Sequence, residues 1–469
     1  MSKFAARMRA VPFHAALRLK GRTHQYLAVL RESERAERRL LYEAQDRLRL
    51  RIVTHASKAV PYYRQLFECL DLRGDRVLSE WETIPTLNRS TLIGEFETLK
   101  SEVGDAKHWK VNSSGGSTGE PVRFVQDSVE RDWARALKLN YDSWTGYSVG
   151  ERKILLWGSE RDLFFGKETL SKRVVQRFKG EILLNAFRMK RDDLIRYVDI
   201  VERFKPAQIL AYVDAAHELA TFMELEGRTL STPPRAIMTS AGTLYDEVRQ
   251  KIERVFGTPV FNRYGSREVG DVACDCGAGE GLHVSPLTHF VEIVGPDGRT
   301  VPDGQLGEIV VTSLTNVAMP LIRYRIGDMG VKSARACSCG RSWPLLERVE
   351  GRSVDMIRRR DGTSLSPLFL VHMIGVVVNQ GWVRKFQVVQ HSLGEIEIRI
   401  VLWDRARSGD ENMLGEFSSV AQKVAELIGP GTVVRYTMVE EIAKEPSGKF
   451  RYVVSKVNSK SECGDRPNG

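Results

Sequence analysis

The sequence has few cysteines and no long hydrophobic run, and both absences restrict the class of protein. It contains six cysteines in 469 residues. Four of them form two Cys-x-Cys pairs, which is too few and too irregular for the disulfide framework of a small secreted protein. The longest apolar run, residues 369–378, is interrupted by His372 and Gly375 and has about half of the ~20 residues that a membrane span needs. No N-terminal stretch has the pattern of a secretion signal. We therefore expect a cytoplasmic protein.

Acidic residues are absent from the first thirty positions, whereas the whole chain carries 70 basic and 60 acidic residues and a net charge of +10. The basic N-terminal segment is interspersed with apolar residues, so it is either a solvated arm or a weak contact with an anionic membrane surface. The remaining excess of positive charge is spread along the chain and suits a phosphate-rich small ligand. No recognised nucleic-acid-binding module is present, so we expect no nucleic-acid partner.

Helical and strand-like stretches alternate through the first two thirds of the chain. Periodic apolar residues predict helices at 34–59, 193–204 and 245–256. Short apolar runs predict strands at 153–157, 208–212 and 259–262. This alternation is typical of sheets covered by helices. From residue 281 the pattern changes to hairpins, with strands expected at 289–294 and 306–314.

A second α+β pattern begins after Gly351. It predicts strands at 385–389, 395–402 and 433–439 and helices at 368–378 and 414–428. The predicted fold class is therefore α/β, with a large multi-sheet N-terminal domain that includes a β-rich hairpin subdomain, and a small mobile α+β C-terminal domain. The predicted boundaries are 1–33 for the basic arm, 34–352 for the large domain, 353–458 for the small domain and 459–469 for the tail.

The most informative segment is a loop rich in glycine and hydroxyl residues, Asn112-Ser113-Ser114-Gly115-Gly116-Ser117-Thr118-Gly119-Glu120-Pro121. Its backbone N–H groups can point inward as an anion-binding nest, and its hydroxyls can donate to phosphate oxygens. It is not a Walker A loop, because no lysine and no helix follow it. Strand-like flanks at 109–111 and 122–125 predict a strand–loop–strand flap over a nucleotide. The alternative is a flexible surface turn.

Four further segments follow this loop in a fixed order: Asn262-Arg263-Tyr264-Gly265-Ser266-Arg267-Glu268, Tyr324-Arg325-Ile326-Gly327-Asp328, Glu350-Gly351-Arg352 and Pro446-Ser447-Gly448-Lys449. Together with the loop, they resemble the motif series of the adenylate-forming superfamily of acyl-CoA synthetases, adenylation domains and luciferases. The segment Val60-Pro61-Tyr62-Tyr63-Arg64 and the Cys-x-Cys pairs are more specifically similar to the phenylacetate–CoA ligase family and its relatives in capsule and polysaccharide biosynthesis.

The resemblance implies a set of roles for these motifs. Ser114, Ser117 and Thr118 would hold the β- and γ-phosphates of ATP within the backbone of Gly115, Gly116 and Gly119. Glu268 would bind Mg²⁺, and Asp328 would accept the ribose hydroxyls. Tyr264, followed by Gly265 and Ser266, would pack on adenine opposite Ala241 and Gly242. Arg352 would contact ribose or phosphate, and Lys449 would stabilise the adenylation transition state.

Three positions depart from the family's pattern. Glu120 stands where a lysine is common, Arg267 where a threonine is common, and Val354 at the usual hinge position beside Asp355. Glu120 removes a phosphate-pairing cation, and Arg267 would replace it. The hinge between the two domains is expected just after Arg352.

Cysteine and histidine residues from two loops suit a tetrahedral Zn²⁺ site. Cys274, Cys276 and His283 lie in one loop, and Cys337 and Cys339 in the other. The resemblance favours Cys276, His283, Cys337 and Cys339 as ligands of a closed, structural zinc site. The alternative is a set of reduced surface thiols.

The resemblance implies ATP-dependent activation of a carboxylic acid to an acyl-AMP, and transfer of the acyl group to coenzyme A; we expect an aryl or short acyl acid. A second hypothesis replaces coenzyme A by a carrier-protein thiol or an amine in polysaccharide or secondary-metabolite assembly. A third, of another class, is a catalytically silent nucleotide-binding scaffold that uses its basic arm.

Overall fold

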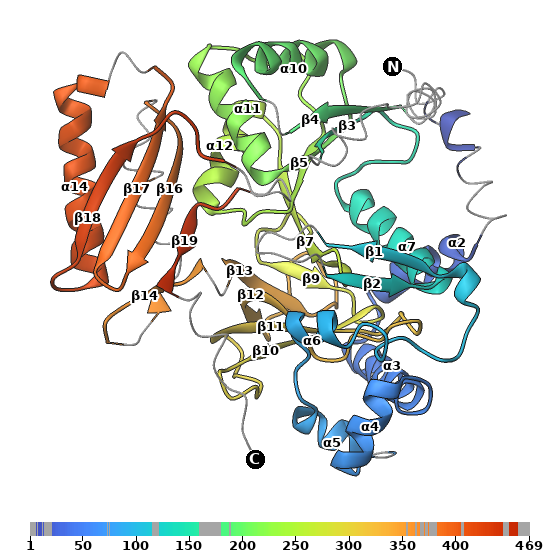
Figure 1. The fold of residues 1–469 in the computed structure, drawn as a ribbon. Coiled ribbons are helices and arrows are strands. Elements are labelled where there is room, and N and C mark those ends of the chain that lie inside the picture. Colours follow the sequence, from blue (N-terminus) through green and yellow to red (C-terminus); the bar gives the residue numbers. More distant parts are fainter. Residues whose placement is uncertain are drawn as a thin grey trace.

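The computed structural model describes residues 6, 8–11, 13, 21–72, 74, 76–114, 122–158, 180–186, 189–352, 355–361, 364–365, 370, 374, 382–404, 408–443 and 450–457. Figure 1 shows a large body built around a long mixed sheet and a smaller C-terminal sheet beside it.

The N-terminal part is helical. Its α-helices are α2 (Thr23–Ser33), α3 (Arg38–Ala59), α4 (Pro61–Leu70), α5 (Arg76–Ser79) and α6 (Arg89–Gly94). Helix α3 begins four residues later than the predicted helix 34–59. Helix α2, which lies within the predicted arm, packs on α7 (Ser128–Trp144) through the stacked rings of Tyr26 and Trp133, and its Leu30 is fully buried. Residues 23–33 are therefore part of the packed large body.

The large sheet joins a parallel half to an antiparallel half. Its strands are, in sheet order, β10 (His289–Val294), β11 (Leu306–Ser313), β12 (Tyr324–Ser333), β13 (Leu345–Arg352), β9 (Leu282–Val284), β8 (Gly270–Asp275), β7 (Val260–Ser266), β6 (Ala236–Ser240), β5 (Gln208–Tyr212), β3 (Lys153–Trp157) and β4 (Glu181–Asn185). Strand β7 is the junction, because it pairs in parallel with β6 and antiparallel with β8. The sequence predictions of β3, β5 and β10 are confirmed to the residue.

Helices cover the parallel half of the sheet (Figure 1). These are α10 (Arg191–Phe204), α11 (Val213–Leu225) and α12 (Asp246–Phe256). Most residues of helix α11 are buried, and α10 and α12 each bury one apolar face. The α/β fold class is confirmed. The crossovers β5–α11–β6 and β6–α12–β7 bring the carboxyl ends of three strands to one edge.

The C-terminal part forms its own four-stranded sheet, in the order β18 (Val433–Met438), β17 (Glu395–Leu402), β16 (Val383–Ser392) and β19 (Val453–Ser455). Helix α14 (Glu411–Ile428) packs on it through Phe417 and Val424. A short hairpin, β14 (Ile357–Arg358) and β15 (Ser364–Leu365), precedes this sheet. Of the predicted helix 368–378, the structure describes only positions 370 and 374.

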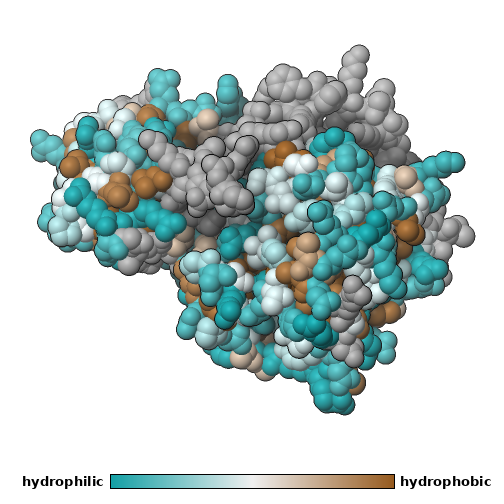
Figure 2. All heavy atoms as spheres, turned by 60° about the horizontal axis from the view of Figure 1, so that its bottom comes forward, coloured by the Kyte–Doolittle hydropathy of each residue, from teal (hydrophilic) through white to brown (hydrophobic). Residues whose placement is uncertain are grey.

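On the face in Figure 2, hydrophobic side chains occur in small groups among hydrophilic ones. In the part of the chain that the structure describes, no helix combines the length and hydrophobicity of a membrane span.

Candidate active site

A pocket of about 110 Å³ lies where the parallel half of the large sheet meets the antiparallel half. The large body supplies residues that directly follow β5 and β6, residues 262–265 of β7, Asp328 of β12 and the end of β13. The C-terminal part supplies residues 450–453 and Asp355. A ligand pocket at the carboxyl ends of parallel strands is typical of open α/β sheets.

A partly buried hydrogen bond joins two of the predicted nucleotide-binding residues. The Tyr264 hydroxyl donates to Asp328 Oδ2 at 2.9 Å, and Arg352 Nε lies 3.9 Å from Asp328 Oδ1. Burial and the neighbouring Asp328 carboxylate raise the pKa of Tyr264 far above its ordinary value, so the phenol stays protonated as the donor. Asp328 lies within β12, opposite Arg352 of β13, rather than after a strand. A carboxylate has acceptor capacity beyond this one hydrogen bond, and here it lines the pocket.

Tight backbone geometry shapes the wall of the pocket around β6 and β7. Ala241, just after β6, has a φ of +63°, which is uncommon for a residue with a side chain. At Gly265 a Cβ atom would lie 2.2 Å from the carbonyl oxygen of Gly270, so only glycine fits between β7 and β8. Ala241, Gly242 and Gly265 all line the pocket, where bare backbone can approach a flat ring.

The predicted phosphate loop is closed at its base by a strand pair. Strands β1 (Lys110–Ser113) and β2 (Arg123–Gln126) pair antiparallel, which confirms the strand–loop–strand arrangement. The buried Ser114 donates its backbone N–H to Val122 O at 2.8 Å, and its Oγ accepts from Val122 N at 3.2 Å. The other predicted loop residues, Gly115, Gly116, Ser117, Thr118, Gly119 and Glu120, lie outside the described residues.

The turn between β7 and β8 contacts the base of this loop. Arg267 Nη1 donates to the carbonyl oxygen of Ser113 at 3.2 Å. Glu268 occupies the same turn and lies close to Tyr324. Burial is the larger cause of the raised pKa of the Tyr324 phenol, and the Glu268 carboxylate adds to it. The predicted Mg²⁺ ligand therefore lies on a turn tied to the phosphate loop. Ser266, at the end of β7, accepts a hydrogen bond from Val269 N at 3.4 Å within this turn.

The C-terminal part contributes a segment that immediately follows the predicted catalytic lysine. Lys449 lies outside the described residues, but Phe450 and Tyr452 line the pocket beside Asp328. Tyr452 packs edge-on against Tyr245 of the large body with ring centroids 6.1 Å apart.

A second cluster lies on the antiparallel half of the sheet, apart from the pocket. The ligand atoms of Cys276, His283, Cys337 and Cys339 lie within 4.8 Å of one another. Cys276 Sγ is 3.6 Å from Cys337 Sγ, and Cys339 Sγ is 3.3 Å from His283 Nε2. Tetrahedral Zn²⁺ with Zn–S bonds of about 2.3 Å holds its sulfur atoms about 3.8 Å apart, so the four residues fit zinc. Cys274 is fully buried, and its thiol is directed to Asp275 O.

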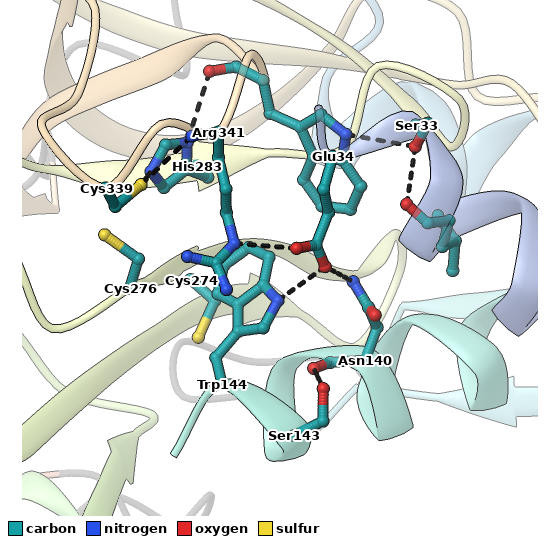
Figure 3. A network of polar contacts seen from close by, with 12 residues as sticks. Ser33, Glu34, Asn140, Ser143, Trp144, Cys274, Cys276, His283, Cys339 and Arg341 are labelled. Carbon is teal, nitrogen blue, oxygen red and sulfur yellow. Dashed lines mark hydrogen bonds and ion pairs between the residues drawn. The ribbon is translucent and has the colours of Figure 1, made fainter. Parts of the chain in front are cut away.

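The surroundings of the cluster orient these groups (Figure 3). His283 Nδ1 lies 3.3 Å from Trp343 O, which favours a proton on Nδ1 and leaves Nε2 free as a ligand atom. Burial lowers the pKa of His283 and keeps the ring neutral. Arg341 donates its backbone N–H to Cys339 Sγ at 3.4 Å and its Nε to Glu34 Oε2 at 2.9 Å. Helix α2 is thereby tied to the cluster through the residue that follows it.

Comparison with known proteins gives one family match and several full-length relatives. Residues 357–456, which include β14 to β19 and α14, match the CapK C-terminal domain family. The CapK protein of Staphylococcus aureus is 22% identical over 430 residues, covering 89% of this chain and 90% of CapK. The phenylacetate–coenzyme A ligase of Thermus thermophilus is 25% identical over 468 residues, covering 90% of this chain and 98% of that enzyme.

The chain is a relative of the phenylacetate–coenzyme A ligases and of CapK. The predicted resemblance is confirmed. Among solved structures, 2-hydroxyisobutyryl-CoA ligase in its postadenylation state with R3-HIB-AMP superposes with a TM-score of 0.66 at 18% identity, covering 89% of each chain. The same ligase in its thioesterification state, with 2-HIB-AMP and coenzyme A, gives a TM-score of 0.55 at 18% identity and covers 91% of each chain. These likenesses show that the chain shares the fold of this CoA ligase.

The sequence patterns did not identify several residues that line the pocket of this chain. Tyr245 and Tyr452 form part of the wall, and Arg451 makes an ion pair with Asp355 within it. Burial, reinforced by the nearby Arg352, lowers the pKa of Arg451 to about 10. Residues 450–453 come directly after the Pro-Ser-Gly-Lys motif, and this proximity was the one available signal for Arg451 and Tyr452.

Proposed function

We propose that this protein is an ATP-dependent ligase that converts a carboxylic acid to an acyl-AMP and then to a coenzyme A thioester. The observation that carries the proposal is the meeting, in one pocket, of the Tyr264–Asp328 pair and the segment that follows Lys449. The relatives named phenylacetate–coenzyme A ligase support the same reaction type. The expected substrate is an aryl or short acyl acid.

In the first half-reaction, a carboxylate oxygen of the acid attacks the α-phosphorus of ATP. The new acyl–phosphate bond forms as the bond to the β-phosphate oxygen breaks, and pyrophosphate leaves. Asp328 would accept the ribose hydroxyls while Tyr264 packs on adenine opposite Ala241 and Gly242. Arg352, beside Asp328, would contact ribose or the α-phosphate. These groups hold the nucleotide so that its α-phosphate faces the acid.

Negative charge develops on phosphate oxygens in this step, so fixed cations and N–H donors accelerate it. Ser114, Ser117 and Thr118 would hold the β- and γ-phosphates, and Arg267 would add a positive charge at the base of the loop. Lys449 would neutralise charge on the reacting oxygens. Mg²⁺ bound with ATP would neutralise phosphate charge, and Glu268 would hold it, since a hard cation suits one carboxylate plus phosphate oxygens.

In the second half-reaction, a thiol attacks the carbonyl carbon of the acyl-AMP, a thioester forms, and AMP leaves. Coenzyme A is the proposed acceptor. The alternative acceptor is a carrier-protein thiol or an amine in polysaccharide or secondary-metabolite assembly. The acceptor affects only the second half-reaction, so adenylation is expected in both cases.

The test is a screen of aryl and aliphatic acids for pyrophosphate release, with and without coenzyme A. Acid-dependent release that accelerates when coenzyme A is added, with formation of the thioester, supports the proposal. Acid-dependent ATP–pyrophosphate exchange without faster pyrophosphate release on addition of coenzyme A supports the carrier or amine acceptor. No release with any acid contradicts adenylation itself.

We also propose a structural Zn²⁺ held by Cys276, His283, Cys337 and Cys339. Four protein ligands leave no open position, so the ion would pin two loops of the antiparallel half of the sheet. Metal analysis of the purified protein should find about one zinc per chain. Cys339→Ser should lose zinc and stability, whereas Cys274→Ser should retain the ion. Equal zinc content in the two variants contradicts this ligand set.

The location proposed for this protein is the cytoplasm. Among the described residues, Cys69, Cys274, Cys276, Cys337 and Cys339 are free thiols, which suits a reducing compartment. Residues 1–30 would add at most a weak contact with an anionic membrane surface.

A further inference from the structure

Glu218 of α11 is a buried carboxylate that faces the C-terminal sheet. Its side chain is 3% exposed. Its Oε1 accepts from Arg384 Nη2 at 2.7 Å and from Arg384 Nε at 3.1 Å, and its Oε2 lies 3.0 Å from Lys385 Nζ. Both cations belong to β16 of the C-terminal part. One carboxylate of the large body therefore binds two basic side chains of the small one.

A local irregularity in β16 makes this double contact possible. Successive side chains of a regular strand point to opposite faces, so two neighbouring residues could not reach the same carboxylate. The register of β16 on β17 shifts between Val383 and Lys385. A bulge of this kind places an extra residue in one strand and re-aims its side chain. Here it turns both Arg384 and Lys385 toward Glu218.

Further contacts hold the Arg384 side chain in place. Arg384 Nη2 also donates to Met189 O at 3.1 Å, and its guanidinium lies 5.6 Å from the centre of the Trp403 ring. Buried ion pairs hold geometry strongly, because removal of one partner leaves a desolvated charge without compensation. The attachment of β16 to α11 is thus sensitive to the charge at Glu218.

Strand β16 connects this attachment to the pocket. It pairs in parallel with β19, with Val388 opposite Val453. Val388 N donates to Tyr452 O at 2.8 Å, and Gln387 Nε2 donates to Arg451 O at 2.9 Å. The residues held by β16 are those that line the pocket directly after Lys449. The ion pairs of Glu218 therefore act on the strand that holds Arg451 and Tyr452.

We propose that Glu218 is a positioning residue for adenylation: its ion pairs with Arg384 and Lys385 hold the C-terminal domain where residue 449 reaches the nucleotide. This inference rests on the proposed function. Any arrangement that withdraws β16 from α11 must break these pairs.

The test compares the two half-reactions in Glu218→Gln, which keeps the shape of the side chain and removes its charge. Acid-dependent ATP–pyrophosphate exchange should fall tenfold or more in kcat. KM for ATP should change less than threefold, because Tyr264 and Asp328 belong to the large body. Thioester formation from synthetic acyl-adenylate and coenzyme A should stay within twofold of wild type or rise. Adding Arg384→Gln and Lys385→Gln to this variant should cause little further loss.

The matched control is Glu224→Gln on the same helix. Glu224 also pairs with two cations, Lys251 at 3.2 Å and Arg254 at 2.8 Å, but both belong to α12 of the large body. This variant should leave both half-reactions unchanged. If Glu218→Gln does not fold, the Arg384→Gln/Lys385→Gln variant carries the same test, because these side chains are 30% and 18% exposed.

Unchanged exchange in a folded Glu218→Gln protein, or equal losses in the two half-reactions, would overturn the positioning role. Small-angle X-ray scattering gives a second readout, since loss of the ion pairs should broaden the distribution of distances between the domains. A wild-type protein with no acid-dependent exchange would instead contradict the proposed function.

Discussion

Replacement of Asp328 by asparagine should weaken ATP binding while leaving the fold intact. Asparagine has nearly the same shape and keeps one carbonyl oxygen, which can still accept the hydrogen bond of Tyr264 that spans 2.9 Å in the wild type. The substitution removes one anionic acceptor that faces the pocket. The other side-chain position becomes an amide donor and cannot accept a ribose hydroxyl.

The size of the effect follows from the hydrogen bond that is lost. A hydrogen bond to a charged group contributes about 1.5–3 kcal/mol. At about 1.4 kcal/mol per factor of ten, the apparent affinity for ATP should fall about 10- to 150-fold. The side chain of Asp328 is 17% exposed, so solvent screening is limited and the upper half of this range is expected.

The assay is acid-dependent ATP–pyrophosphate exchange over a range of ATP concentrations. KM for ATP should rise, whereas the melting temperature should change little. The control is Glu308→Gln, which removes a carboxylate of β11 that is paired at 3.4 Å with Arg325 of β12, outside the pocket. A KM for ATP within threefold of wild type in Asp328→Asn, together with a lower melting temperature, would show that Asp328 serves only as the partner of Tyr264.

Two further predictions concern stability and the pocket wall. Burial raises the pKa of Glu130 to about 7, although a hydrogen bond from Thr315 opposes this shift, so the folded state holds the proton more tightly than the unfolded state. The free energy of unfolding should therefore fall by roughly 3 kcal/mol as pH rises from about 4.5 to about 7. Thermal unfolding of Glu130→Gln should not show this loss of stability. Gly265→Ala should lower the free energy of unfolding by roughly 2–4 kcal/mol, because the new methyl group meets the carbonyl of Gly270. Gly415→Ala, in the middle of α14 with open space around it, should instead be neutral or stabilise by up to about 1 kcal/mol in the same denaturant titration.

Short apolar runs were sufficient to predict the sheet strands. Strands β3, β5 and β10 are bounded by polar or turn residues, and their side chains are mostly buried, so local pattern and final structure agree. The same holds for β17, where polar and apolar residues alternate from Glu395 to Ile400.

Helix α3 confirms most of the predicted helix 34–59, but its buried face differs from the repeat that predicted it. A repeat of four residues through Leu40, Leu48 and Ile52 predicted one helix from residue 34, but Leu40 is 47% exposed. The helix turns every 3.6 residues, so a four-residue repeat drifts around its surface. Its buried face includes Arg49, whose guanidinium lies between the rings of Trp81 and Phe290. A buried arginine that depends on distant aromatic rings cannot be read from local hydrophobicity.

The sequence also predicted only part of the candidate site. Motif order identified Tyr264, Asp328 and Arg352, which the structure brings together in one pocket. Glu218 and Tyr245 lie in no motif, because their roles arise from contacts between parts of the chain that are far apart in sequence. Such long-range contacts are set by topology, and a single sequence carries no local signal for them.

The most direct test of the central claim is the partition of the two half-reactions in Lys449→Met. The side chain of methionine has similar length and no charge, so the variant isolates the cation that the C-terminal domain is proposed to deliver. Acid-dependent ATP–pyrophosphate exchange should fall by about 100-fold or more, in line with the loss of a preorganised charge at the reacting phosphate. Thioester formation from synthetic acyl-adenylate should remain within a few-fold of wild type. Exchange at the wild-type rate in Lys449→Met would contradict the account.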